Sequence, residues 1–283
     1  MTSTITLSFL INLLIGGSLN LLWGMFENQQ VVVHSALNDI EYPGNVAFFY
    51  SYLLNIAAFD VFPTDDIFDW FFIFKPSEPV TARFGALGYE TKYFVKNMGT
   101  AFIIGVVFAI LLILTLFLYV LNKIVNISVT EKVANWVYRM VCWNPILRFL
   151  IESYIFFAIS CFINLTEFTF GDSGSRASSI STVVGMIIII VLPFLVLCFM
   201  LLKFTKLKNK QVIAKYGAMY EGLDLDKGRT VILARLFFFF RRLIIGLSVN
   251  YLRDDPVFQI FSMNFQVVAA IILHGQINPH PTR

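Results

Sequence analysis

The sequence predicts an all-α fold, a polytopic transmembrane helix bundle with seven (or six) membrane-spanning helices. Of its 283 residues, 58% are hydrophobic and only 14% are charged, whereas about one quarter of a soluble globular protein is charged. Apolar stretches of about 20 residues, the length that a helix needs to cross a bilayer, recur along the chain. Lysine and arginine gather in a few clusters between these stretches, which is typical of residues that set membrane topology. We therefore treat residues 1–283 as a single transmembrane helical domain.

Six stretches are long and apolar enough to span a membrane: Ile5–Phe26, Gly99–Val125, Ile146–Phe168, Ser181–Phe204, Val231–Leu252 and Val257–Ile277. The first lacks the positive n-region of a secretory signal, and its apolar run exceeds the usual core of about 7–15 residues, so we expect a retained helix. A seventh stretch, Asn45–Phe62, carries Asp60 near its end. It either spans the membrane or forms a re-entrant or interfacial segment, and this choice decides between seven and six helices.

The distribution of basic residues predicts the orientation. The connection 203–229 is the most basic, whereas its neighbouring connections hold only Arg176 and Arg253. Because positive loops stay on the cytoplasmic side, we expect 203–229 to be a basic cytoplasmic loop and 63–98 to be an extracellular or interfacial connection. The C-terminus is then cytoplasmic, and the N-terminus lies outside with seven helices or inside with six.

Five lysines of the basic loop are candidates for lipid-headgroup contacts: Lys203, Lys206, Lys208, Lys210 and Lys215. Each basic residue beside an anionic leaflet contributes about 1 kcal/mol to binding. The alternative, which we favour, is that these lysines only enforce the topology. On the opposite side, the stretch "FPTDDIFDWFFIFKPSEP" mixes acids with aromatic rings, which indicates a short interfacial element. A divalent-ion site is the alternative there, but the spacing matches no EF-hand.

The helix predicted over Val231–Leu252 contains "ARLFFFFRRLIIG", in which three arginines interrupt an apolar run. Arg235 lies within two turns of the cytoplasmic end, where a long side chain can reach the headgroups. Arg241 and Arg242 lie roughly 15–17 Å into the helix by its rise per residue. A lone charge at that depth costs at least about 2.5–3.5 kcal/mol, so we expect these side chains to face a partner or water.

Glu152 is the leading partner for these arginines, because it lies about two turns from the cytoplasmic end of its own predicted helix. Arg148, four residues earlier, competes for it. We therefore predict an intramembrane charge network that comprises Glu152, Arg235, Arg241, Arg242 and Arg148. The network is either a buried ion pair that locks two helices, a lining for an ion or solute path, a voltage-sensitive element, or a site for lipid phosphate.

The sequence offers no catalytic constellation. It contains no GxGxxG, P-loop, GxSxG or HExxH pattern, and its three histidines are scattered. Cys142, Cys161 and Cys198 are odd in number and widely spaced, so we interpret them as packing residues. We predict a protein that is not an enzyme, has no cofactor, metal or catalytic residues, and with a net charge of only +3 does not bind nucleic acid.

The order of five motifs resembles the C-terminal membrane region of large ciliate surface proteins, whose long extracellular parts are cysteine-rich. The motifs are "YPGNVAFFYSYLLNIAAFDVFPTDD", "LGYETKYFVKNMGT", "LRFLIESY", "AKYGAMYEGL" and "FFFRRLI" followed by "DPVFQIF". The resemblance runs from about Gly16 to Ile277 and implies a multi-pass module of the plasma or ciliary membrane; members are sometimes labelled channel-like. This chain departs from the pattern at Met1, with almost nothing before its first helix, so it is either a stand-alone member or a fragment.

Two functions remain open. The first is a non-enzymatic membrane protein that anchors or assembles a cell-surface or ciliary complex, with the lipid bilayer and other membrane or surface subunits as partners. The alternative is an ion channel or transporter subunit of a TRP/polycystin-like or novel type. Such channels place a pore loop between their last two helices, for which "RDDP" is too short, and the arginines lack the three-residue spacing of a voltage sensor. We therefore expect the anchoring or assembly role.

Overall fold

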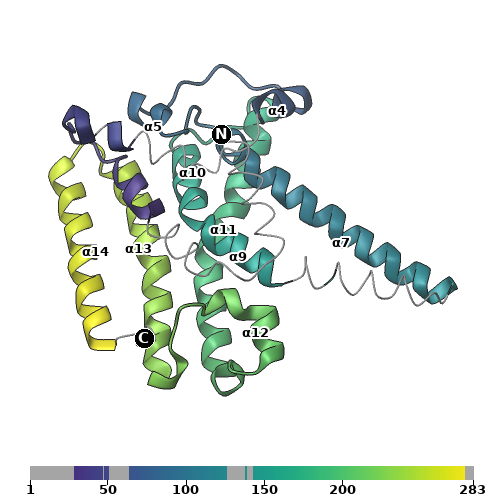
Figure 1. Ribbon diagram of the computed structural model, residues 1–283. Helices are drawn as coiled ribbons and strands as arrows, with labels where there is room; N and C mark the ends of the chain where they lie inside the picture. Colours follow the sequence, from purple (N-terminus) through teal and green to yellow (C-terminus); the bar gives the residue numbers. More distant parts are fainter. Residues whose placement is uncertain (1–28, 47, 51–63, 126–137, 139–142, 278–283) are drawn as a thin grey trace.

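The computed structural model describes residues 29–46, 48–50, 64–125, 138 and 143–277, and every regular element within them is helical. Helix α10 (Tyr154–Thr166) lies between α11 (Ser173–Lys203) and α13 (Ile232–Tyr251), and α14 (Pro256–Ile277) packs on the far side of α13 (Figure 1). The all-α prediction is confirmed. The predicted span Ile5–Phe26 and most of Asn45–Phe62 lie outside the described residues.

Three of the described helices are long and apolar enough to cross a membrane: Gly99–Ile124, Ser173–Lys206 and Pro256–Ile277. Together, α9 (Asn144–Glu152) and α10 make a fourth candidate that is bent by 53°. The described part of the chain thus holds three or four candidate spans, which corrects the expected seven. Helix α13 is not among them, because three arginines interrupt its apolar run. These apolar helices indicate an integral membrane protein in contact with the lipid bilayer.

Two predicted helix boundaries were wrong for local reasons. The predicted helix Ile146–Phe168 breaks after Glu152, where the buried Ser153 hydroxyl donates to Phe149 O, a back-bond that bends helices. The helix predicted from Ser181 begins eight residues earlier, because Asp172 and Ser175 form a reciprocal capping box in front of it. Polar residues thus bend one candidate span and extend the other.

The centre of the bundle is closely packed. A Cβ atom added at Gly246 of α13 would lie 3.2 Å from the Phe162 ring and 3.4 Å from Ala158, both on α10. Gly246 is therefore a close contact between two helices. Cys161, also on α10, is buried and not disulfide-bonded. Small residues let α10 and α13 approach closely, which fixes the depth of the arginines relative to their neighbours.

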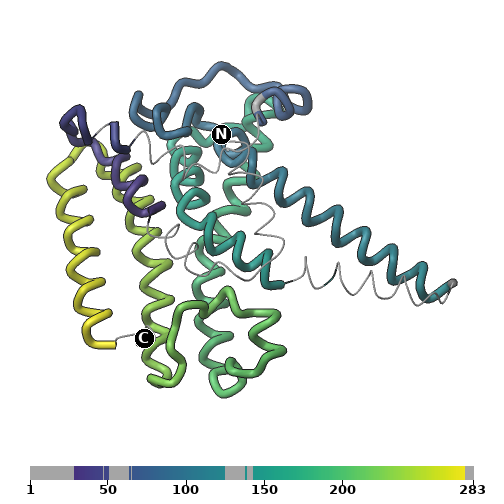
Figure 2. Tube along the Cα trace, in the orientation of Figure 1, coloured from purple at the N-terminus to yellow at the C-terminus, as the bar shows by residue number. Residues whose placement is uncertain are grey.

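Helix α7 (Gly99–Val125) leaves the bundle at its N-terminal end and extends away from it (Figures 1 and 2). Its buried apolar side chains all belong to its first half, at Ala101, Ile104 and Phe108. Beyond them the helix exposes many large aliphatic and aromatic side chains, among them Leu116 and Ile124. A face of this kind suits lipid or another membrane helix.

The two predicted connections are ordered and lie at opposite ends of the bundle (Figure 1). Residues 63–98 contain α4 (Asp65–Phe71), α5 (Ala82–Ala86) and α6 (Phe94–Asn97). Residues 203–229 contain α12 (Lys210–Tyr216) and the 3-10 turns η1 (Phe204–Lys206), η2 (Gly217–Met219) and η3 (Leu225–Lys227), and a further turn, η4 (Arg229–Val231), leads into α13. Turn η2 and α12 pack on α9, so the basic segment is part of the fold.

A buried arginine cluster as the candidate functional site

The cluster is organised around one phenylalanine of α13. Arg235 and Arg242 are buried, with exposed fractions of 7% and 2%. Phe238 lies between them: its ring centroid is 4.7 Å from Arg235 Cζ and 3.6 Å from Arg242 Cζ. These residues are three and four apart, so helical geometry stacks them on one face. An aromatic face attracts a cation that has left water, so Phe238 stabilises both guanidinium groups.

The remaining phenylalanines of "FFFF" have different surroundings. Phe239 is buried against Tyr154 of α10, with ring centroids 5.0 Å apart, whereas Phe240 is exposed on the outer face of α13. The rings spread around the helix because successive residues turn by about 100°.

Arg235 binds backbone carbonyls. Its Nε donates to Met219 O and its Nη2 donates to Ala218 O, both at 2.7 Å. These carbonyls end the turn η2, where the chain leaves its helical hydrogen bonding. Charge-assisted hydrogen bonds of this length are strong, and they join α13 to the basic segment. Sequence reasoning missed this contact, because no sequence pattern shows which backbone carbonyls a turn leaves without a backbone hydrogen bond.

Arg148 joins the same turn from α9. Its guanidinium forms a salt bridge with Glu221, just after η2. Nearby, Asn144 Oδ1 accepts a hydrogen bond of 2.8 Å from Ala218 N. The sequence did contain a signal for Glu221, the first of three acids in "YEGLDLD" that follow the five lysines of this connection. The structure therefore assigns Arg148 an acidic partner outside its own helix, which the sequence analysis had not weighed.

Arg242 faces the N-terminal part of the described chain. Its Nη2 donates to the fully buried Gln30 Oε1 at 3.3 Å. Next to Gln30, the His34 ring is hydrogen-bonded through Nδ1 to Gln30 O at 2.6 Å and through Nε2 to Tyr89 Oη at 3.0 Å. Burial lowers the pKa of His34 to about 4, and Arg242 lowers it as well, against the opposing hydrogen bond to Gln30. His34 is therefore neutral and adds no second positive charge beside Arg242.

The predicted network is brought together in part. Arg235 and Arg242 meet at Phe238, and Arg235 and Arg148 meet at η2. Glu152, at the end of α9, is buried with an exposed fraction of 3%, and its pairing with Arg235 or Arg242 stays a prediction. Arg241 does not join the cluster, because it points about 100° away from Arg242 around α13.

The candidate lipid-contacting lysines are all exposed in or beside the basic segment. One of them, Lys208, forms a salt bridge with Asp226. Exposed pairs of this kind contribute about 0–1 kcal/mol, so Lys208 can still leave Asp226 and contact a lipid headgroup. The choice between headgroup binding and topology alone therefore stays open.

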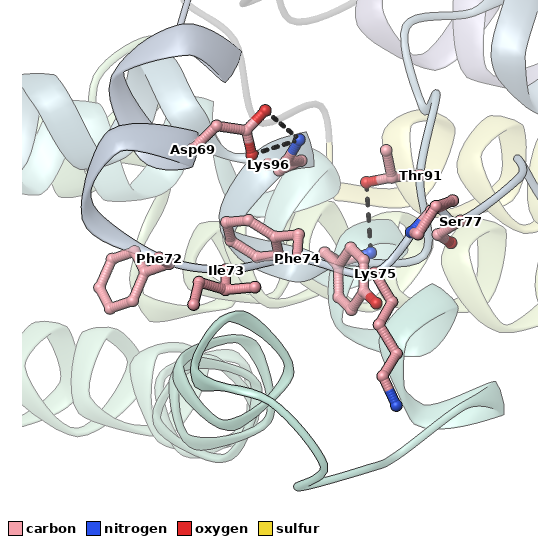
Figure 3. Close-up of a pocket in the computed structure, with 10 residues that line it drawn as sticks. Asp69, Phe72, Ile73, Phe74, Lys75, Ser77, Thr91 and Lys96 are labelled. Atoms are coloured by element: carbon pink, nitrogen blue, oxygen red, sulfur yellow. Dashed lines mark hydrogen bonds and ion pairs between the residues drawn. The ribbon is translucent and has the colours of Figure 1, made fainter.

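The opposite end of the bundle has an open cavity of about 490 Å³ between residues 69–77 and 91–96 (Figure 3). Lys96 Nζ lies 2.8 Å from Asp69 Oδ1 and stands over the Phe74 ring at 5.0 Å. Trp70 is 80% exposed on α4 beside it, which fits the expected interfacial element. Among the described residues, no group of three side chains is placed to hold a metal ion.

A scan against protein-family models and searches of curated proteins and of solved structures found no match to this chain. Chemically, the arginine cluster binds carbonyl, amide and carboxylate oxygens and aromatic faces. Guanidinium stays protonated at any accessible pH, so the charge of these groups is permanent and they do not transfer protons. The arrangement is suited to holding helices and the basic segment in fixed positions.

Proposed function

We propose that this chain is a non-enzymatic multi-pass membrane protein that anchors or assembles a cell-surface or ciliary membrane complex. The arginine cluster carries this proposal: charges that are costly to bury are engaged in contacts that join α9, α13, the turn η2 and the segment around Gln30. Charges that lined a path for ions would need to face water. The resemblance to ciliate surface proteins supports the choice of membrane.

The same contacts support α13 as a further span. It lies alongside α10, α11 and α14, and its length of 20 residues corresponds to about 30 Å. By composition alone α13 is not a candidate span, because it contains three arginines. Cation–π contacts and hydrogen bonds compensate two of these charges, Arg235 and Arg242. The opposite positions of α12 and α4 support a cytoplasmic 203–229 and an external 63–98 (Figure 1).

One observation favours the alternative of a channel or transporter subunit. Tyr89, His34, Gln30 and Arg242 form a series of buried polar side chains within the bundle. Against a pore-loop channel, α13 ends at Tyr251 and α14 begins at Pro256, which leaves no room for a re-entrant loop between them.

A flux assay tests the two functions directly. The purified chain is reconstituted into phosphatidylcholine vesicles that carry a potassium- or proton-sensitive dye, with an applied membrane potential. An anchoring module leaves the vesicles as tight as protein-free vesicles. Flux that scales with the amount of protein, and that Arg242→Gln or His34→Phe changes, would replace this proposal with the alternative.

A further inference from the structure

Arg241 is the arginine of α13 that the cluster does not use. It is half-buried, and the described part of the chain offers it no hydrogen bond, ion pair or ring contact. It is the tenth of the 20 residues of α13, so about 15 Å of helix separates it from either end. An arginine side chain cannot reach a headgroup from the centre of a span, and an uncompensated guanidinium there is costly.

A second unsatisfied polar side chain lies in the middle of the neighbouring helix. Gln266 of α14 is 2% exposed, and neither its amide nitrogen nor its amide oxygen has a hydrogen-bond partner among the described residues. Buried amides are almost always paired, so this residue requires an explanation. Gln259, two turns earlier on α14, is paired: its Nε2 donates to Ser248 O of α13 and its Oε1 accepts from Asp39 N.

The Gln259 contact fixes the register of the two helices. Helices α13 and α14 are joined by four residues and run antiparallel (Figure 1). Seven residues beyond Gln259 is Gln266, and seven residues before Ser248 is Arg241. Seven residues are close to two turns, about 10 Å along each helix, and return to nearly the same face. Arg241 and Gln266 therefore lie at the same level of the seam between α13 and α14.

We propose that Arg241 and Gln266 form a carboxylate-binding site at the centre of this seam, and that its occupant is an aspartate or glutamate in a membrane-spanning helix of a partner protein. A guanidinium donates two parallel hydrogen bonds to a carboxylate, and the amide of Gln266 supplies a third donor. Lipid phosphate lies at the headgroup level, far from this depth, so the occupant is a side chain of another helix.

A second copy of this chain does not supply the acid from its described spans. Helices α7, α10, α11, α13 and α14 contain no aspartate or glutamate, and Glu152 of α9, in the bent candidate span, is buried within its own bundle with an exposed fraction of 3%. The outer face of α14 beside the seam exposes Phe258, Phe261 and Phe265, which provides an apolar surface for a packed helix. Outside the described residues, Asp60 lies near the end of the Asn45–Phe62 stretch and not at its centre. We therefore assign the central acid to a different protein, and this inference rests on the proposed assembly function.

The test uses the full chain in phosphatidylcholine nanodiscs and a synthetic transmembrane helix of about 20 leucine and alanine residues. One peptide carries a central aspartate, a second has leucine at that position, and a third has the aspartate near one end. Binding is measured by energy transfer between labels on chain and peptide. We expect the central-aspartate peptide to bind at least about tenfold more tightly than the other two, which corresponds to about 1.4 kcal/mol.

Variants of the chain identify the site. Arg241→Gln should remove the tenfold preference, whereas Phe240→Leu, an exposed neighbour on the same helix, should keep it. Gln266→Glu should also abolish binding, because it gives Arg241 a carboxylate within the chain, and it should raise the midpoint of thermal unfolding. If the two residues were not level, the same substitution would bury an unpaired acid and lower that midpoint, which contradicts the register.

Equal binding of all three peptides, or an undiminished preference in Arg241→Gln, would overturn the inference. Self-association of the chain that Arg241→Gln abolishes would overturn the assignment of a different partner and would implicate an acid such as Asp60 of a second copy. Vesicle flux is a separate readout: flux would refute the assembly function without affecting the peptide result. If the vesicles stay tight but the chain shows no preference for the central-aspartate peptide, only this site is refuted.

Discussion

Replacing Arg235 by methionine should release the basic segment from the bundle while the bundle itself stays folded. The guanidinium donates to Ala218 O and Met219 O at 2.7 Å, and these two bonds connect α13 to the turn η2. Methionine keeps most of the apolar stem that packs beside Phe238. The substitution therefore removes the hydrogen bonds and the charge and little of the packing.

The magnitude follows from the two contacts. Hydrogen bonds to charged groups contribute about 1.5–3 kcal/mol each, so the pair contributes about 3–6 kcal/mol to holding the segment. Water that reaches the two carbonyls in the variant recovers part of this loss, which leaves an expected loss of about 2 kcal/mol. At 1.36 kcal/mol per tenfold, local opening of residues 210–221 becomes about 30-fold more frequent.

Amide hydrogen exchange measured by mass spectrometry in detergent or nanodiscs reads this opening directly. Peptides from 210–221 should lose about 30-fold of their protection, whereas those from α10 and α11 should be unchanged. Lys208→Met is a matched control, because it breaks the exposed pair with Asp226 and should change exchange by much less. Unchanged exchange of 210–221 in Arg235→Met would refute the idea that this arginine holds the segment.

Three further predictions concern topology, charge pairing and pH. A cysteine reporter placed in 63–79 of intact cells should react with an impermeant reagent and one in 206–215 should not, and the reverse pattern would contradict the orientation. Glu152→Gln alone should lower the thermal midpoint more than Glu152→Gln combined with Arg242→Met, because the single change leaves a buried cation uncompensated; a double variant that is no better than the single one would contradict the pairing. Because the pKa of His34 is about 4 when folded and 6.5 when unfolded, its contribution to stability is complete above pH 6.5 and is lost as the pH falls toward 4. His34→Phe should flatten that part of the stability–pH curve, and an unchanged curve would exclude this histidine.

The sequence was sufficient for properties that depend on local composition and periodicity. Apolar runs of the required length predicted the all-α class and the approximate positions of α7, α11 and α14, because a helix in a membrane must satisfy its own backbone hydrogen bonds. In any α-helix the 100° step between residues places Arg235 and Arg242 on one face and Arg241 on another, so this arrangement follows from the sequence.

Only the tertiary structure decided which groups the buried arginines meet. Glu221 and the carbonyls of η2 are more than 70 and 15 residues distant in sequence from Arg148 and Arg235 respectively, and Gln30 is 212 residues from Arg242. No local pattern encodes such a contact, since a carbonyl becomes available only where a turn happens to end against another helix. The register of α13 and α14, which places Gln259 against Ser248 O, was likewise set by packing. The sequence determined which residues are costly to bury in a membrane, and the fold determined what compensates them, because that cost is local while compensation requires partners brought together in three dimensions.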